Sequence, residues 1–278
     1  MILIVGGDGL IGSELHRLLA DAGENVVATT RRRDGEGIHL DLAQADAFSV
    51  SPDVKTAVLC AGIGSLQQCA DDPKGTARIN VKGSATIARK VAAAGGQVIA
   101  LSTNLVLNGA NPAARADEPL APCCEYGRQK AALEEQLKGS QFACVRLTKV
   151  IETLLPRFRN WKDALVAGGE VSASPELRFS PVLLSEVCAA LAELTRNFQP
   201  GVFHISGDRD FSYQEAANEL AEMLGAGGKR VRADRLGGAN LLSPVPKFAT
   251  LGRSVPSDCS RWSFSPSSDT LARFLRSL

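Results

Sequence analysis

A glycine-rich turn between an apolar run and an amphipathic segment opens this sequence. Ile2 to Val5 is the apolar run, and Ser13 to Ala22 is the amphipathic segment. Between them, Gly6, Gly9 and Gly12 are spaced three residues apart. In a strand–turn–helix unit the first glycine permits the turn, the second lets backbone approach a pyrophosphate, and the third lets the helix pack on the strand. The turn therefore predicts a dinucleotide site at a helix N-terminus, and a glycine-rich loop without a ligand is the alternative.

Strand and helix patterns alternate over the first 147 residues. Thr56 to Cys60, Gln97 to Leu101 and Phe142 to Leu147 are short apolar runs typical of buried strands. This alternation predicts an α/β fold with a doubly wound parallel sheet of the Rossmann type. Further strands at Arg178 to Leu183 and Gly201 to Ser206 are expected to rejoin the sheet or its edge. The predicted nucleotide-binding domain is thus 1–147 plus 178–206, with a small substrate-binding lobe from 148–177 plus 207–278.

Composition excludes several classes of protein. The chain has 278 residues, 45% hydrophobic and 22% charged, as expected of a globular protein with a sizeable core. The formal net charge of +1 gives no support for a nucleic-acid or membrane-surface partner. No apolar run has the length of a membrane span, and no signal peptide is recognised. The seven cysteines form no C-x-x-C pair, so we expect no metal site, no disulfide framework and a cytoplasmic location.

The end of the second predicted strand, which runs from Asn25 to Thr30, indicates which dinucleotide is bound. NAD sites usually place an acidic residue there for the ribose 2′-hydroxyl. Here Thr29 and Thr30 are followed by Arg31, Arg32 and Arg33. Arginines bind a phosphate through paired hydrogen bonds, so NADP(H) is the expected cofactor and NAD is less favoured. The alternative is a solvated basic turn.

A tyrosine and a lysine four residues apart form the candidate proton-transfer pair. Tyr126 and Lys130 share one face of a helix predicted to run from Glu125 to about Leu137. Only Tyr126, of the two tyrosines in the chain, has a lysine at this spacing. A nearby ammonium and a bound nicotinamide are expected to lower the tyrosine pKa from its reference value of about 10. Ser102 and Thr103 end the fifth predicted strand, where they are either site residues or turn caps.

These residues together resemble a known family. The chain is similar to the extended short-chain dehydrogenase/reductases, in the NAD-dependent epimerase/dehydratase superfamily, and looks most like the dTDP-4-dehydrorhamnose reductase group. The resemblance covers nearly the whole chain. It rests on the glycine motif, Asp41-Leu42, Ala61-Gly62, Asn80, Ser102-Thr103, Tyr126-x-x-x-Lys130, Arg146, Arg178 to Leu183 and Gly201 to Gly207.

The resemblance implies a role for each matching residue. Tyr126 would be the general acid/base, Lys130 would bind the nicotinamide ribose, and Thr103 with Ser102 would hydrogen-bond the substrate oxygen. Hydride would pass from the nicotinamide to a sugar ketone carbon. The implied cofactor-binding residues are Gly6, Gly9, Leu10, Ile11, Gly12, Arg31, Arg32, Asp41, Leu42, Ala61, Gly62 and Lys130. The expected substrate-binding residues are Asn104, Arg157, Trp161 and Arg178.

One departure from the family pattern and one ambiguous cluster leave alternatives open. The rhamnose-type reductases usually read Asp-Tyr-Val-Phe after Ser-Thr, whereas this chain reads Asn104-Leu105-Val106-Leu107. The basic and aromatic cluster at 157–162 suits a diphosphate and a base, but it also fits a solvated helix face with a packed tryptophan. We expect an NADP(H)-dependent reductase that acts on a nucleotide-linked keto-sugar. A homodimer is compatible with this expectation. A sugar-nucleotide epimerase and a non-catalytic NADP-binding regulatory subunit are the alternatives.

Overall fold

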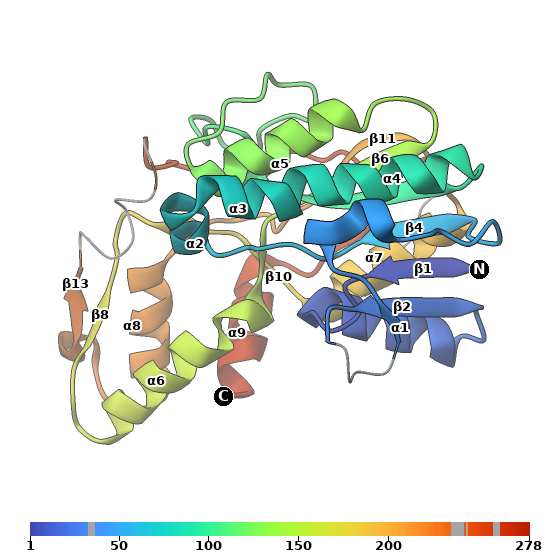
Figure 1. Cartoon of the computed structure of the whole chain (residues 1–278). Helices are drawn as coiled ribbons and strands as arrows, with labels where there is room; N and C mark the ends of the chain where they lie inside the picture. The colour runs from blue at the N-terminus through green and yellow to red at the C-terminus, as the bar shows by residue number, and fades with distance from the viewer. Residues whose placement is uncertain (33–36, 235–241, 243, 258–261) are drawn as a thin grey trace.

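The computed structural model describes residues 1–32, 37–234, 242, 244–257 and 262–278, so Arg33 of the basic run lies outside the described residues. A seven-stranded parallel sheet occupies the centre of the nucleotide-binding part (Figure 1). Its order is β11-β6-β5-β4-β1-β2-β3, so the direction of winding reverses between β1 and β4. This order confirms the predicted doubly wound fold, which places ligands at the carboxyl ends of the strands near the reversal. The strands are β1 (Ile2–Val5), β2 (Val26–Thr30), β3 (Ile38–His39), β4 (Thr56–Leu59), β5 (Gln97–Thr103), β6 (Phe142–Leu147) and β11 (Gly201–Ile205).

Helices cover both faces of this sheet, which is why its inner strands read as continuous apolar runs. On one face, α1 (Leu10–Asp21) and α7 (Leu184–Arg196) pack over side chains such as Ile4 and Ile99. On the other face lie α4 (Ser84–Ala93) and α5 (Glu125–Gln136). None of the helices in the described part of the chain is long and apolar enough to cross a membrane.

The helical segment between residues 73 and 93 has three parts. α3 (Pro73–Ala77) begins at Pro73, because Asp72 caps the Gly75 N–H at 2.9 Å and proline occupies the first turn. A π-helical segment, η2 (Arg78–Gly83), follows and leads into α4. The widened turn carries Asn80 inward to full burial. Such π-helical turns are frequent at functional sites.

Residues 178–183 do not join the central sheet, and that prediction is wrong. β9 (Arg178–Phe179) pairs antiparallel with β12 (Phe211–Ser212), and β10 (Pro181–Val182) pairs with β7 (Lys149–Val150). Pro181 has no N–H to donate, which disfavours a place inside a continuous ladder. The other predicted strand is present as β11, at the sheet edge beside β6.

A second hydrophobic core lies beyond the sheet, at the left of Figure 1. There Phe158 packs against Phe274 at a ring-centroid distance of 5.3 Å. Ser212 and Glu215 form a capping box at the start of α8, in which each side chain bonds the backbone N–H group of the other residue. The helices and strands of this part are α6 (Leu155–Val166), β8 (Val171–Ala173), α8 (Tyr213–Met223), β13 (Val231–Ala233) and α9 (Ser267–Arg276). This part also contains the short helices η4 (Ile151–Leu154) and η5 (Gly228–Arg230), and η1 (Leu42–Ala47), α2 (Leu66–Asp71) and η3 (Asn104–Val106) lie elsewhere.

Candidate active site

A cavity of about 800 Å³, here named the first cavity, lies at the carboxyl ends of β1, β2 and β4. It is the place where the sheet order reverses, and such a crevice is where doubly wound folds bind nucleotides. The residues expected to hold the cofactor that line this cavity are Gly6, Gly9, Arg31, Arg32, Asp41, Leu42, Ala61 and Gly62. The predicted cofactor residues that gather here come from four separate segments of the chain.

The glycines of the turn meet different requirements. Gly6 has a φ of +94°, and a Cβ there would lie 2.7 Å from the Ala61 nitrogen. A Cβ on Gly12 would lie 2.1 Å from the Gly6 oxygen, so helix and turn need that glycine to pack. At Gly9 the nearest atom would be 3.5 Å away, an ordinary contact. Gly9 is therefore dispensable for the fold, and a close ligand would explain its presence.

Leu10 and Ile11 do not line the first cavity. The Leu10 side chain is exposed, whereas that of Ile11 packs against the core beneath α1. The N-cap of α1 is Gly9, which has no side chain to bond the first N–H groups of the helix. The first turn of α1 can therefore offer only its backbone N–H groups to an anion.

Arg31 and Arg32 lie on the rim of the first cavity, and both are exposed. The cavity also contains Asp8, a carboxylate that the sequence reasoning missed although it stands within the glycine motif. The Thr30 hydroxyl donates a hydrogen bond to it. Asp41 is occupied as the cap of η1, where it accepts from the Ala43 N–H at 2.9 Å. The two arginines thus share the cavity with Asp8, which the second strand holds in place, and with Asp41, Asp71 and Asp72.

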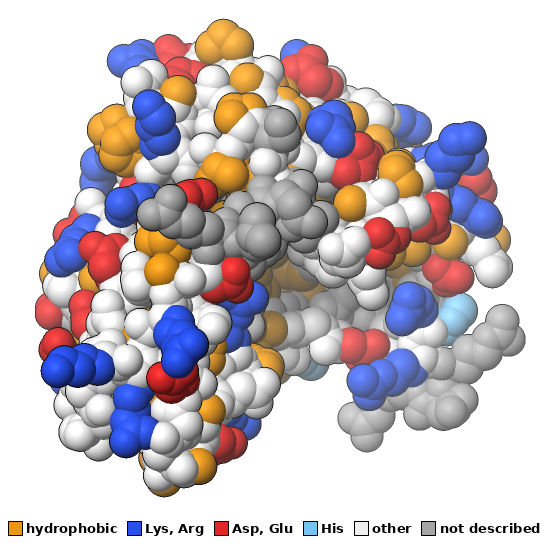
Figure 2. Space-filling model, turned by 90° about the vertical axis from the view of Figure 1, so that its left-hand side faces the viewer, with side chains coloured by type: hydrophobic (Ala, Val, Ile, Leu, Met, Phe, Trp, Pro, Cys, Tyr) orange, Lys and Arg blue, Asp and Glu red, His pale blue; other side chains and the backbone are white. Residues whose placement is uncertain are grey.

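A second cavity, of about 780 Å³, adjoins the first through Gly64, which lines both. It contains side chains from the sheet ends and from the second core, and a hollow is visible near the centre of one face in Figure 2. The predicted residues that line it are Ser102, Thr103, Asn104, Tyr126, Arg157 and Arg178. Proton-transfer and substrate candidates from four parts of the chain therefore meet in one place.

Tyr126 and Lys130 lie one turn apart in α5, with the Lys130 Nζ 5.9 Å from the centre of the tyrosine ring. Lys130 is buried and donates to the Leu101 carbonyl at 2.9 Å. Burial lowers the pKa of Lys130 and raises the pKa of Tyr126 above its usual value. In the protein alone, desolvation of the phenol dominates the Tyr126 pKa. The expected lowering requires a bound nicotinamide as well as Lys130, and it stays a prediction. The phenol stays protonated near neutral pH, which is the form that a proton donor requires.

Ser102 and Thr103 point to different partners because successive side chains of a strand alternate. The Ser102 hydroxyl donates to Glu134, which also forms a buried ion pair with Arg146 at 2.7 Å. The Thr103 hydroxyl lies 3.4 Å from the Asn104 Oδ1 and accepts from the Leu105 N–H at 3.3 Å. Ser102 therefore belongs to the network that joins β5 to α5, whereas Thr103 bonds only its neighbours in sequence.

Trp161 does not reach the second cavity, so its predicted role in substrate binding is wrong. It is 9% exposed and packs on Phe158 at a centroid distance of 4.8 Å inside the second core. Arg157, one turn earlier in α6, does line the cavity. Its guanidinium lies 4.8 Å from the ring centre of Tyr213, which itself packs on Phe179. Sequence reasoning missed this aromatic pair, because its two residues are far apart in the chain and lie outside any motif.

Among the described residues, no group of three or more His, Cys, Asp or Glu side chains could hold a metal ion.

The family model described as RmlD substrate binding domain matches residues 1–255. The chain belongs to this family. Family membership agrees with the resemblance inferred from the motifs.

Two relatives and one solved structure are similar to this chain over most of its length. The spore coat polysaccharide biosynthesis protein SpsK of Bacillus subtilis (strain 168) is 27% identical over 242 residues, covering 81% of this chain and 79% of SpsK. The methionine adenosyltransferase 2 subunit beta of Pongo abelii is 25% identical over 281 residues, covering 94% of this chain and 80% of that protein. A solved structure that superposes on this chain is that of a dTDP-4-dehydrorhamnose reductase from Bacillus anthracis str. Ames in complex with NADP. The TM-score is 0.81 at 17% identity, and the superposition covers 100% of this chain and 99% of the reductase. This last similarity shows the fold.

Proposed function

We propose that the protein is an NADP(H)-dependent reductase of a nucleotide-linked keto-sugar. The observation that carries this proposal is the meeting of Thr103, Tyr126 and Arg157 in a cavity that adjoins the first cavity. A hydroxyl, a proton donor and a cation are the groups that a charged sugar substrate and its ketone require. The relatives support this substrate class, since one functions in polysaccharide biosynthesis and another reduces a dTDP-linked sugar.

The residues of the first cavity fit an NADP molecule. The uncapped N-terminus of α1 suits the pyrophosphate, and the open space beside Gly9 lets it approach the backbone. Arg31 and Arg32, which line this cavity, would bind the 2′-phosphate through charge-assisted hydrogen bonds. Asp41 and Leu42 would flank the adenine, and Ala61 and Gly62 would lie along the cofactor.

The chemistry then divides among a few side chains. NADPH, when bound, supplies the hydride that reduces the ketone carbon. Tyr126 donates its phenolic proton to the oxygen, and Thr103 stabilises the charge that develops there. Lys130 holds the nicotinamide ribose, while Asn104 and Arg178 bind the sugar nucleotide together with Arg157.

Replacing Tyr126 with phenylalanine tests the assignment. Tyr126→Phe should lower turnover at least about 100-fold, the contribution expected of a positioned general acid. NADPH affinity, measured by fluorescence titration, should stay within a factor of about two, because Tyr126 does not line the first cavity. Turnover that survives in the variant would show that another group protonates the oxygen.

A non-catalytic, NADP-binding regulatory subunit is the second candidate. It is favoured by the similarity to methionine adenosyltransferase 2 subunit beta over 94% of this chain. The Asn104-Leu105 departure also weakens the reductase signature. NADPH oxidation with a panel of keto-sugar nucleotides separates the candidates. A subunit would bind NADPH and show no turnover with any member of the panel.

A further inference from the structure

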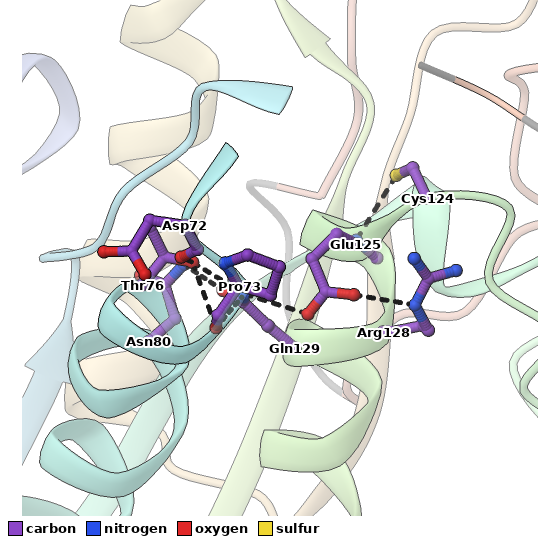
Figure 3. A network of polar contacts seen from close by, with 9 residues as sticks. Asp72, Pro73, Thr76, Asn80, Cys124, Glu125, Arg128 and Gln129 are labelled. Atoms are coloured by element: carbon purple, nitrogen blue, oxygen red, sulfur yellow. Dashed lines mark hydrogen bonds and ion pairs between the residues drawn. The ribbon is translucent and has the colours of Figure 1, made fainter. Parts of the chain in front are cut away.

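A buried network of polar side chains joins the two cavities (Figure 3). Its centre is Gln129, which lies in α5 between Tyr126 and Lys130 and lines neither cavity. Gln129 is 2% exposed, and its partner Asn80 is fully buried. Buried amides at such depth need hydrogen-bond partners, and each of these has several.

Asn80 holds the wall of the first cavity. Its Oδ1 accepts from the Ile63 N–H at 2.7 Å, and its Nδ2 donates to the Ile63 carbonyl at 3.0 Å. Ile63 follows Ala61 and Gly62, and all three line the first cavity. One side chain therefore fixes both backbone groups of a residue beside the expected cofactor position.

Gln129 connects Asn80 to α5, the helix that carries Tyr126. Its Oε1 accepts from the Asn80 Nδ2 at 2.8 Å. Its Nε2 donates to the Thr76 hydroxyl at 2.8 Å and to the Glu125 Oε1 at 3.1 Å. Figure 3 shows Asn80 and Gln129 facing one another from η2 and α5. Displacement of Ile63 by a ligand would therefore be transmitted to α5 through two rigid amides.

We infer that Gln129 is a positioning residue that couples the first cavity to the second through its amide pair with Asn80. The inference rests on the proposed binding of NADP(H) in the first cavity and of a nucleotide sugar in the second. Coupling between two ligands is reciprocal and is measured as the change that one makes in the affinity for the other. It is therefore separable from the stability of the fold.

The test compares Gln129→Met with Gln136→Met, the same substitution at an exposed glutamine two turns later in α5. Every partner of Gln129 keeps another bond, such as that from Arg128 to Glu125, so the variant should fold. NADPH affinity is measured for wild type and both variants, alone and with saturating dTDP as the probe for the second cavity. Circular dichroism and thermal melting check the fold.

In wild type and Gln136→Met, dTDP should change the NADPH affinity by at least about fivefold, the lower end of usual coupling. In Gln129→Met, that change should fall to less than about twofold. Wild-type coupling retained in Gln129→Met would overturn the inference, as would wild-type protein that binds NADPH but does not respond to dTDP. Wild-type protein that does not bind NADPH would instead refute the proposed function, and the inference with it.

Discussion

The first cavity is lined in part by glycine and alanine residues that follow strands, whereas the second is lined by residues of the sheet ends and of the second core. Gly6, Ala61 and Gly62 illustrate the first kind, and Arg157, Tyr213 and Phe179 the second. A backbone-lined site appears in the sequence as small residues at fixed spacing after apolar runs. A site of side chains from distant elements leaves no such spacing. The difference explains why most of the predicted cofactor residues gather at the first cavity, whereas sequence reasoning missed Tyr213 and Phe179 at the second.

The largest expected effect separates two residues of one helix that the sequence had grouped together. Trp161→Ala should lower the free energy of unfolding by about 3–5 kcal/mol, because it opens a void in the second core. Arg157→Ala should leave that free energy nearly unchanged and raise the KM for the sugar nucleotide. Chemical denaturation and steady-state kinetics check the pair. Equal losses of stability would show that Arg157, too, is a packing residue.

The next effect distinguishes a glycine that the fold needs from one that the ligand needs. Gly12→Ala should destabilise the protein by about 1–3 kcal/mol, since its Cβ would overlap the Gly6 oxygen. Gly9→Ala should leave stability unchanged and weaken NADPH binding, because its Cβ meets only an ordinary protein contact. Melting curves with and without NADPH measure both effects. A Gly9→Ala protein that binds NADPH as wild type does would contradict the close approach of a pyrophosphate.

A smaller effect tests which dinucleotide the first cavity prefers. Replacing Arg31 and Arg32 with alanine should weaken NADPH binding by at least about tenfold, because charge-assisted hydrogen bonds to the 2′-phosphate are lost. NADH affinity should change little. Arg17→Ala, in an exposed ion pair on α1, is the matched control and should affect neither cofactor. Equal losses for NADPH and NADH in the double variant would refute the NADP preference.

The smallest effect concerns the contact between the sheet edge and the later chain. His204 of β11 is buried, its Nδ1 lies 2.8 Å from the Gly252 carbonyl, and burial lowers its pKa from 6.5. Because the unfolded chain binds the proton more tightly, stability is present above about pH 6.5 and is lost as pH falls below it. The loss is at most about 1.4 kcal/mol per pH unit. His204→Gln should flatten this part of the pH–stability curve, and His39→Gln, an exposed control, should not.

Much of the fold followed from local patterns, and the exceptions have physical reasons. The parallel sheet and the helix of Tyr126 were both predicted. Residues 178–183 read as one sheet strand, but the run breaks at Ser180 and its two halves pair elsewhere. The π-helical turn at Asn80 was not predicted, and the bonds of Asn80 to Ile63, seventeen residues away, leave no local pattern in the sequence.

By itself, the sequence determined where backbone must turn tightly or approach another chain segment, because only glycine and small residues meet those demands. It thereby located the first cavity and the pairing of Tyr126 with Lys130 on one helix. Only the tertiary structure decided which side chains line the second cavity and which have buried partners. It directed Ser102 to a buried ion pair, placed Trp161 in a core and brought Tyr213 beside Arg157, since burial and partners depend on elements far apart in the chain.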